Sequence, residues 1–183
     1  YHFHDTSDTS GARLIGPISD NFSLKPDGSN LAAYLYLIMN QYPKHFEQII
    51  ETIRLLAPFF HTFILRPTAE NQEMIRLSWQ EVGSDTVFQG HQMSDGLLRF
   101  TLLVTLLMQP VELRPSIIII DEPELHIHKA ILNSLWDELE KERQDCVFMY
   151  VTHDLDFAAS RNVEKVLWIK SFDGNNLWDY EFL

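Results

Sequence analysis

Four consecutive isoleucines lead straight into two acidic residues in the stretch SIIIIDEPELHIH, residues 116–128, and this feature constrains the fold most. A short β-branched run of this kind is typical of a strand that is buried on both faces of a sheet. Ending such a strand in Asp121 and Glu122 carries a desolvation cost, which a bound cation offsets. The stretch therefore predicts a buried strand with a cation site at its carboxyl end.

A second apolar run, CVFMYV over 146–151, predicts another buried strand, and His153 follows it. The amphipathic stretch between the two strands, 129–143, predicts a helix. Two buried strands joined through a helix form a parallel βαβ unit, so the chain is predicted to belong to the α/β class. Because ligands of such sheets bind at the carboxyl ends of the strands, we expect Asp121, Glu122 and His153 at one edge.

The two carboxylates are predicted to do different work, because neighbouring side chains of an extended backbone point to opposite sides. One carboxylate can hold a hard cation such as Mg²⁺, directly or through water. The other can face an attacking water and take its proton. His153 can donate to a terminal phosphate. The alternatives are a solvated carboxylate pair at a strand end and a structural histidine.

The stretch QMSDGLLRF, residues 92–100, opens a strongly apolar helix predicted over Asp95–Met108. Free backbone N–H groups and the helix dipole at such a start favour an anion. Gly96 lets a phosphate approach the backbone, and Ser94 adds a hydroxyl donor. The alternative is an ordinary N-cap formed by Ser94 and Asp95.

The remaining predicted elements come from periodicity and turn chemistry. They are helices over 31–42 and 43–57, the first capped by Ser29 or Asn30; strands over 60–65 and 73–80; and a closing hairpin formed by KVLWIKSF and NLWDYEF, which Asp173–Asn176 joins.

The order and spacing of MSDG, DEPELHIH and VTHD resemble the C-terminal part of an ABC-type ATPase, a P-loop NTPase, of the RecF/SMC-like branch of predicted AAA-type ATPases. SLKPDGSNLAAYLYLI resembles the region before the signature motif in that group, so the likeness extends over most of the chain. It implies a single domain over 1–183. That domain would have a loop-rich entry over 1–30, helices and short strands over 31–92, and the signature, Walker B strand, D-loop and His switch over 93–183.

The resemblance also implies a role for each matching residue. Glu122 and His153 would be catalytic, the first polarising the water and the second contacting the γ-phosphate, and Asp121 would organise Mg²⁺. The residues that would meet a partner subunit are Ser94, Asp95 and Gly96 at the γ-phosphate of its ATP, and Pro123, Glu124 and His126 in the D-loop. The implied cofactors are ATP and Mg²⁺, and the implied partner is a second ATPase subunit, which makes a homodimer.

No phosphate-binding loop of the form G-x-x-x-x-G-K-[ST] occurs in the sequence. Gly11 and Gly16 have the glycine spacing, but Pro17 and Ile18 follow where Lys and Ser or Thr are needed. Because that loop precedes this region in the resembling family, and because the first residue is Tyr1, we expect a piece of a longer protein. Its N-terminal Walker A lobe would complete the ATP site, and this piece alone would hydrolyse ATP negligibly.

The net charge of −12 argues against this chain as the main surface for nucleic acid, because it repels phosphates. DNA or a nuclease is expected as a partner only through other regions, in the DNA repair, chromosome maintenance or phage defence that the resemblance implies. No apolar run approaches the roughly 18–20 residues of a membrane span. The single cysteine, Cys146, fits a reducing compartment, so we expect a cytoplasmic location without membrane contact.

Two other functions are compatible with the sequence. One is a non-catalytic scaffold or regulatory domain that retains the ATPase fold, against which Glu122 argues. The other is a metal-dependent hydrolase, with ligands drawn from His2, His4, Asp5, His126, His128 and His153. We expect the first two histidines in an unanchored terminal loop, which argues against that site.

Overall fold

The computed structural model describes residues 1–124, 127, 132–133, 135–136, 146–153, 167–170 and 179–182. The chain divides into two compact units, Tyr1–Val151 and Thr152–Leu183. The prediction of one domain over 1–183 stays a prediction. No helix in the described part of the chain is both long and apolar enough to cross a membrane.

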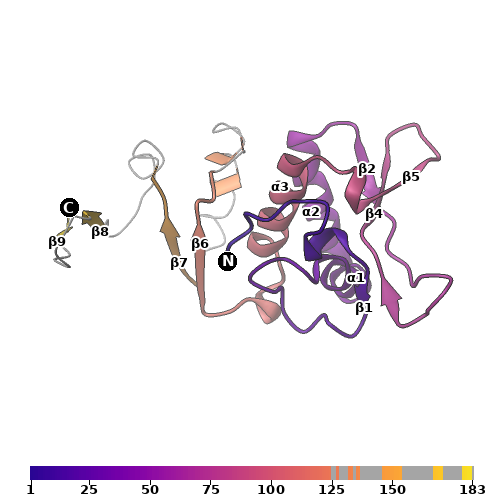
Figure 1. The fold of residues 1–183 in the computed structure, drawn as a ribbon, viewed down its shortest axis with the longest axis horizontal. Helices are drawn as coiled ribbons and strands as arrows, with labels where there is room; N and C mark the ends of the chain where they lie inside the picture. The colour runs from indigo at the N-terminus through magenta and orange to yellow at the C-terminus, as the bar shows by residue number, and fades with distance from the viewer. Residues whose placement is uncertain are drawn as a thin grey trace. The chain divides into compact units, whose positions relative to one another are not determined.

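Three helices form the centre of the first unit: α1 (Leu31–Gln41), α2 (Pro43–Leu56) and α3 (Asp95–Leu107). They confirm the predicted helices to within one or two residues. Every residue of α3 from Leu97 to Leu107 is buried, which explains why its sequence is apolar all round. Figure 1 shows the helices together, with β2, β4 and β5 on one side of them and β6 and β7 on the other. Short 3₁₀ turns lie at Gly11–Arg13, Gly90–Gln92 and Val111–Leu113.

Gly28 lies in the turn before α1 and packs directly on α3. Its φ is 72°, in the left-handed region that favours glycine, and a Cβ added there would stand 2.3 Å from Leu102 Cδ2. Asn30 precedes α1 as predicted, but its side chain does not cap the helix. The amide group accepts from the Lys25 N–H at 2.9 Å and donates to two carbonyls of the preceding loop.

Two small antiparallel sheets hold the middle of the chain. β2 (Phe60–Phe63), β4 (Ser78–Glu81) and β5 (Val87–Gln89) pair in the order β2-β4-β5, and β1 (Gly16–Pro17) pairs with β3 (Met74–Ile75). The strand predicted over 73–80 is therefore two strands. It divides because its first part pairs with β1 and its second part with β2 and β5.

The parallel pair predicted from the isoleucine run is present. β6 (Ile117–Asp121) and β7 (Val147–Val151) run parallel, with Asp121 opposite Val151. The described residues of the predicted crossover helix, 132–133 and 135–136, are helical. Among them Trp136 packs edge-to-face on Tyr150 of β7, with ring centroids 4.7 Å apart. These features confirm the α/β class.

Only one face of this strand pair is buried, so the prediction of burial on both faces was wrong. Ile118 and Ile120 are at most 2% exposed. The alternate residues form one apolar face, which is about half exposed and is called the open face below: Ile117, Ile119, Val147, Met149 and Val151. β-branched runs are typical of a sheet that is packed on both faces. The sequence does not show whether both packing layers come from the same chain.

The second unit contains the predicted closing strands. β8 (Leu167–Lys170) and β9 (Asp179–Phe182) pair antiparallel, with Leu167 opposite Phe182. The turn predicted at Asp173–Asn176 lies outside the described residues.

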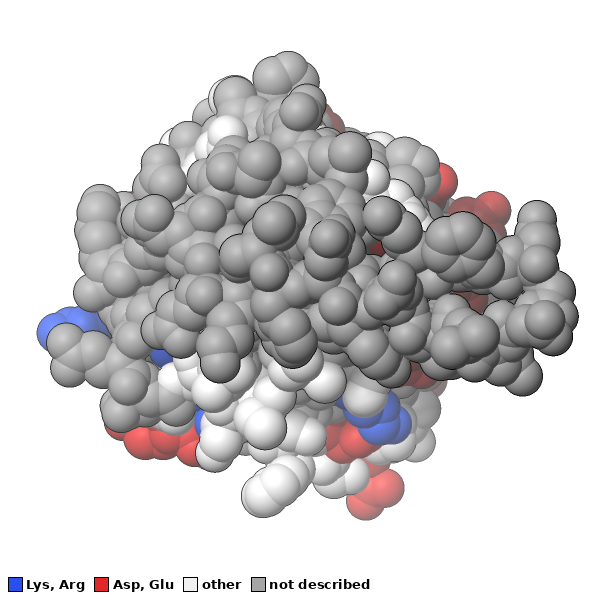
Figure 2. Space-filling view, turned by 90° about the vertical axis from the view of Figure 1, so that its left-hand side faces the viewer, with Lys and Arg blue, Asp and Glu red and all other residues white. Residues whose placement is uncertain are grey.

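Acidic side chains (red) and basic side chains (blue) both lie among the described residues of the face in Figure 2.

Candidate functional site

The start of the chain lies against β6. The Tyr1 nitrogen donates to the carbonyl of Ile119, and the Asp121 N–H donates to the carbonyl of Tyr1 at 3.0 Å. This is the pattern of a bridge between parallel strands. Phe3 is 4% exposed and fastens the segment to the core. The expectation of an unanchored terminal loop was therefore wrong.

Two histidines of this segment meet the carboxylates at the end of β6. His2 Nδ1 lies 2.8 Å from Asp121 Oδ2, and His4 Nε2 lies 3.9 Å from the same oxygen and 3.9 Å from Glu122 Oε2. The two imidazole rings lie against each other at an interplanar angle of 32°, with centroids 3.8 Å apart. Sequence reasoning considered both histidines but not beside Asp121. The alternation in YHFH, with Phe3 buried, is the signal that could have placed them on one face of an extended segment.

The other ligands weighed for a metal-dependent hydrolase do not join them in the described chain. Asp5 Oδ1 accepts hydrogen bonds from the Ser7 N–H and hydroxyl at 3.1 and 2.7 Å, which closes a local turn. His126 and His128 lie outside the described residues. His153 follows β7 but belongs to the second unit, so its place beside the carboxylates stays a prediction.

Glu122 leaves the strand with a left-handed backbone, φ 44°. Its N–H donates to the carbonyl of Val151 at 2.7 Å, so the turn is fastened to the end of β7. The premise of an extended backbone at this pair was wrong. Because the chain turns here, the side chains of Asp121 and Glu122 both come within 3.9 Å of His4 Nε2.

A buried arginine of α3 holds the same turn. Arg99 of α3 is 3% exposed, and its Nη2 donates to the carbonyl of Glu122 at 3.1 Å. Burial lowers the pKa of Arg99, while the nearby carboxylates of Glu122, Glu124 and Asp121 raise it. An arginine pKa starts so high that the group stays cationic. Sequence reasoning missed Arg99, which stands four residues beyond Asp95 in an otherwise apolar helix.

The helix α3 begins where it was predicted, at the segment that the resemblance assigns to the signature motif. Ser94 is the N-cap, and its Oγ accepts from the Leu97 N–H at 3.3 Å. Asp95 is largely exposed, and its Oδ1 lies 2.6 Å from Arg13 Nη2. The N-cap therefore exists, and contacts of Ser94, Asp95 and Gly96 with a partner's phosphate stay a prediction.

Arg13 ties the N-terminal segment to the signature segment. Its side chain is 2% exposed. Besides Asp95, it donates to the carbonyls of Thr6 at 2.9 Å, Gly90 at 2.5 Å and Met93 at 2.6 Å. No local pattern in the sequence singles out this arginine, because three of its four partners, Gly90, Met93 and Asp95, lie 77 to 82 residues away.

The predicted D-loop is described in part. Pro123 is buried, and the carbonyl of Glu124 accepts from the Ile127 N–H at 3.1 Å, which forms a turn directly after Glu122. His126 lies outside the described residues. A place for these residues at a dimer interface stays a prediction.

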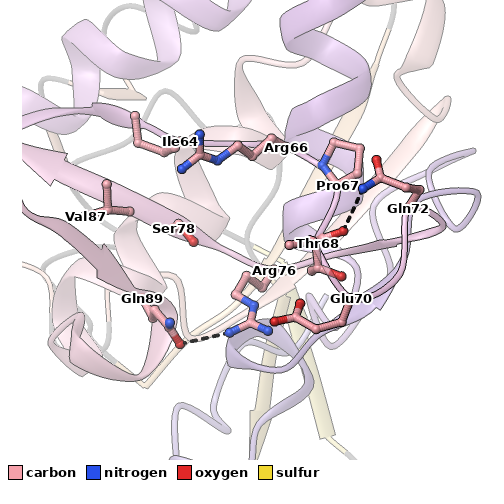
Figure 3. A pocket seen from close by; sticks show the side chains of 11 residues that line it. Ile64, Arg66, Pro67, Thr68, Glu70, Gln72, Arg76, Ser78, Val87 and Gln89 are labelled. Atoms are coloured by element: carbon pink, nitrogen blue, oxygen red, sulfur yellow. Dashed lines mark hydrogen bonds between the residues drawn. The ribbon is translucent and has the colours of Figure 1, made fainter.

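A pocket of about 540 Å³ lies elsewhere in the first unit, lined by the segment that follows β2 and by residues of β4 and β5 (Figure 3). In it Arg76 Nη1 donates to Gln89 Oε1 at 3.4 Å. Arg66 and Glu70 also line it, and none of the residues predicted for the ATP site does.

Asp121 and Glu122, at the end of β6, are called the acidic turn below. The sequence that forms this turn and the surrounding fold matches a known family. The family described as "AAA domain, putative AbiEii toxin, Type IV TA system" matches residues 2–158. The chain belongs to this family. No curated protein matches the chain.

Solved structures of SMC ATPase heads share the fold. A structure from work on the ATP-driven dimerisation and DNA-stimulated activation of SMC ATPases is 16% identical, with a TM-score of 0.53, over 81% of this chain and 89% of that one. The SMC head bound to the C-terminal winged-helix domain of ScpA is 16% identical, with a TM-score of 0.60, over 91% of this chain and 53% of that one. The Pyrococcus furiosus SMC head with an extended coiled coil is 18% identical, with a TM-score of 0.59, over 81% of this chain and 37% of that one.

The family match confirms the predicted membership among the AAA-type ATPases, and the solved structures confirm the predicted ABC-type P-loop NTPase fold that SMC heads share. The chain spans most of the first structure but only 53% and 37% of the other two. The acidic turn also fits the cofactor that the family implies, because Mg²⁺ takes oxygen ligands and Asp121 offers a partly exposed carboxylate at the sheet edge.

Proposed function

We propose that the chain supplies the catalytic carboxylates and the signature segment of an ABC-type ATPase that dimerises around Mg-ATP. The observation that carries the proposal is the acidic turn at the end of β6. Its backbone is held by the Val151 carbonyl and by Arg99, and its two carboxylates converge on one imidazole nitrogen. A charged turn fixed at the carboxyl end of parallel strands suits phosphate-transfer chemistry.

The proposal assigns a role to each residue at the turn. Asp121 binds Mg²⁺, which when bound offsets the negative charge of the phosphates. Glu122 orients the attacking water and accepts its proton, because its backbone is fixed by Val151 and Arg99 while its side chain is 26% exposed. His153 contacts the γ-phosphate.

A second subunit completes each site in this proposal. Ser94, Asp95 and Gly96 bind the γ-phosphate of ATP held by the partner. The D-loop residues Pro123, Glu124 and His126 cross the interface. One SMC structure in the comparison comes from work that names ATP-driven dimerisation, which supports a homodimer here.

The Walker A loop lies in a separate lobe of the same protein. Two observations support this part of the proposal. The open face of β6 and β7 exposes about half of each side chain, which is unusual for an apolar sheet and suits the helix of an adjoining lobe. The chain also spans only part of two of the SMC heads that it resembles.

The process that ATP hydrolysis serves is proposed as DNA repair, chromosome maintenance or phage defence in the cytoplasm. One matched SMC structure comes from work that names DNA-stimulated activation, which supports the two roles on DNA, and the toxin–antitoxin term in the family description supports the third. DNA or a nuclease would bind through other regions, because this chain carries a net charge of −12.

Glu122→Gln in the full-length protein tests the proposal. The variant keeps the shape of the side chain but cannot accept a proton, so we expect ATP turnover to fall by about 100-fold or more. ATP-dependent dimerisation, measured by light scattering, should persist or strengthen because hydrolysis no longer ends it. Glu51→Gln, at an exposed position of α2, is the matched control and should leave both unchanged.

Unchanged turnover in Glu122→Gln would overturn the role of Glu122. A wild-type protein that binds ATP and dimerises without hydrolysing it would favour the alternative of a non-catalytic scaffold.

A further inference from the structure

We propose that His2, His4 and Asp121 form a binding site for one divalent transition-metal ion of the Zn²⁺ or Co²⁺ class. One ligand atom from each residue lies within 4.8 Å of the other two. The inference goes beyond the proposed magnesium role of Asp121. Two imidazoles favour ions that accept nitrogen ligands, whereas Mg²⁺ favours oxygen.

The distances are close to those of a metal site. His2 Nδ1 and His4 Nε2 lie 2.8 and 3.9 Å from Asp121 Oδ2. With metal–ligand bonds of about 2.0–2.1 Å in a tetrahedral arrangement, two ligand atoms stand about 3.3 Å apart. One observed distance is shorter than this and the other longer, so small side-chain rotations would bring both atoms to bonding distance.

The backbone presents both imidazoles before any ion binds. The backbone of Tyr1 forms hydrogen bonds with the backbone of β6 at Ile119 and Asp121. Phe3, which stands between the two histidines in the sequence, is buried. Residues two apart in an extended segment share a face, so His2 and His4 both turn toward the end of β6. Their ring centroids lie 3.8 Å apart at an interplanar angle of 32°, which agrees with this shared direction.

His4 Nε2 is the observation that points most directly to a ligand. This atom is buried and has no hydrogen-bond partner among the described residues. A buried ring nitrogen without a partner is unfavourable, and native structures usually satisfy such atoms. Here it faces the carboxylates of Asp121 and Glu122 at 3.9 Å each, so an ion between them would take Glu122 as a further ligand.

Charge and access also suit a dication. Two carboxylates lie at the site, and neutral imidazoles add no charge of their own. The side chain of His2 is 62% exposed, which leaves an approach from solvent.

The test is a titration of the full-length protein, freed of any affinity tag and without nucleotide, with Co²⁺. We expect a visible absorption band that saturates at one ion per chain and that Zn²⁺ displaces. The double variant His2→Gln/His4→Gln should bind about 100-fold more weakly or worse, since loss of even an outer partner of a ligand costs about 10–100-fold. A large excess of Mg²⁺ should leave the band in place.

His61→Gln is the matched control, because His61 is an exposed histidine on β2. It should bind Co²⁺ as the wild type does. Unfolding curves recorded without metal show whether each variant is folded.

Equal affinity of the wild type and the folded double variant would overturn the site, as would complete displacement of Co²⁺ by Mg²⁺. ATP hydrolysis is measured separately with Mg²⁺. Failure of the metal site and failure of the proposed function are therefore distinguishable.

Discussion

Arg99 Nη2 donates a hydrogen bond to the backbone carbonyl of Glu122, and this 3.1 Å contact joins the signature helix to the acidic turn. Glu122 has φ 44°, a conformation that a non-glycine residue adopts at a cost. The buried guanidinium of Arg99 therefore stabilises the backbone conformation from which the proposed catalytic carboxylate of Glu122 extends. Through this hydrogen bond α3 directly contacts the backbone of Glu122.

Replacing Arg99 with Met should lower the free energy of unfolding by about 1.5–3 kcal/mol, the value of a hydrogen bond to a charged group. If the arginine positions Glu122, kcat in the full-length protein should fall while ATP affinity changes little, and Arg99→Lys should restore part of it. Arg54→Met is the control, because Arg54 Nε donates to the carbonyl of Phe60 at 3.1 Å, on β2. Loss of stability without loss of kcat in Arg99→Met would leave Arg99 a structural role only.

Arg13 should matter more to stability than its ion-pair partner. Arg13→Met removes donors to three carbonyls in addition to Asp95, and we expect a loss of about 2–3 kcal/mol in urea denaturation. Asp95→Asn should cost less than about 1 kcal/mol, because the side chain of Asp95 is 66% exposed. Equal losses would mean that the ion pair, and not the carbonyl contacts, holds the segment.

Local sequence signals predicted the elements that depend on periodicity. The isoleucine run predicted the parallel strand pair, and the apolar pattern of α3 predicted that helix. Both predictions were possible because the spacing of apolar residues within a strand or a helix indicates which of its residues are buried. The closing strands β8 and β9 were predictable for the same reason.

The acidic site was predictable only in part. Asp121 and Glu122 were found from composition at a strand end, but the left-handed turn at Glu122 depends on Val151 and Arg99, which are distant in sequence. His2 meets Asp121 across 119 positions of sequence. The open face could not be predicted either, because the sequence shows that a residue is apolar but not whether this chain or another lobe covers its side chain.

A composite active site predicts that two inactive variants restore each other. Ser94→Arg should block the γ-phosphate position offered to the partner, and Glu122→Gln should block hydrolysis in its own subunit. In a mixed dimer one site carries both defects and the other carries none, so mixing the two variants of the full-length protein should recover ATP hydrolysis. Each variant alone, mixed with itself, is the control. No recovery, in a mixture shown to form mixed dimers, would argue against sites shared between subunits.

The open face predicts protection of Met149 in the full-length protein. Met149 is 52% exposed in this chain, whereas Met93 is 2% exposed. If an adjoining lobe covers β6 and β7, peroxide should oxidise Met149 about as slowly as Met93, because both sulfurs are then shielded. Mass spectrometry of the digested protein measures both rates, with free methionine as the fast reference. Rapid oxidation of Met149 would show that the open face is uncovered.

Two glycines separate the effect of backbone conformation from the effect of close packing. Gly28 and Gly83 have nearly the same φ, 72° and 76°. A Cβ added at Gly28 would stand 2.3 Å from Leu102 Cδ2, whereas a Cβ added at Gly83 would have no described atom within 4 Å. Gly83→Ala should therefore cost about 1 kcal/mol from the left-handed backbone alone. Gly28→Ala should cost about 1–3 kcal/mol more, because the Leu102 side chain or α3 itself must shift to admit the methyl group. Urea denaturation of both variants measures the difference. Equal losses would mean that Leu102 moves aside freely, and that the turn before α1 is not tightly packed on the signature helix.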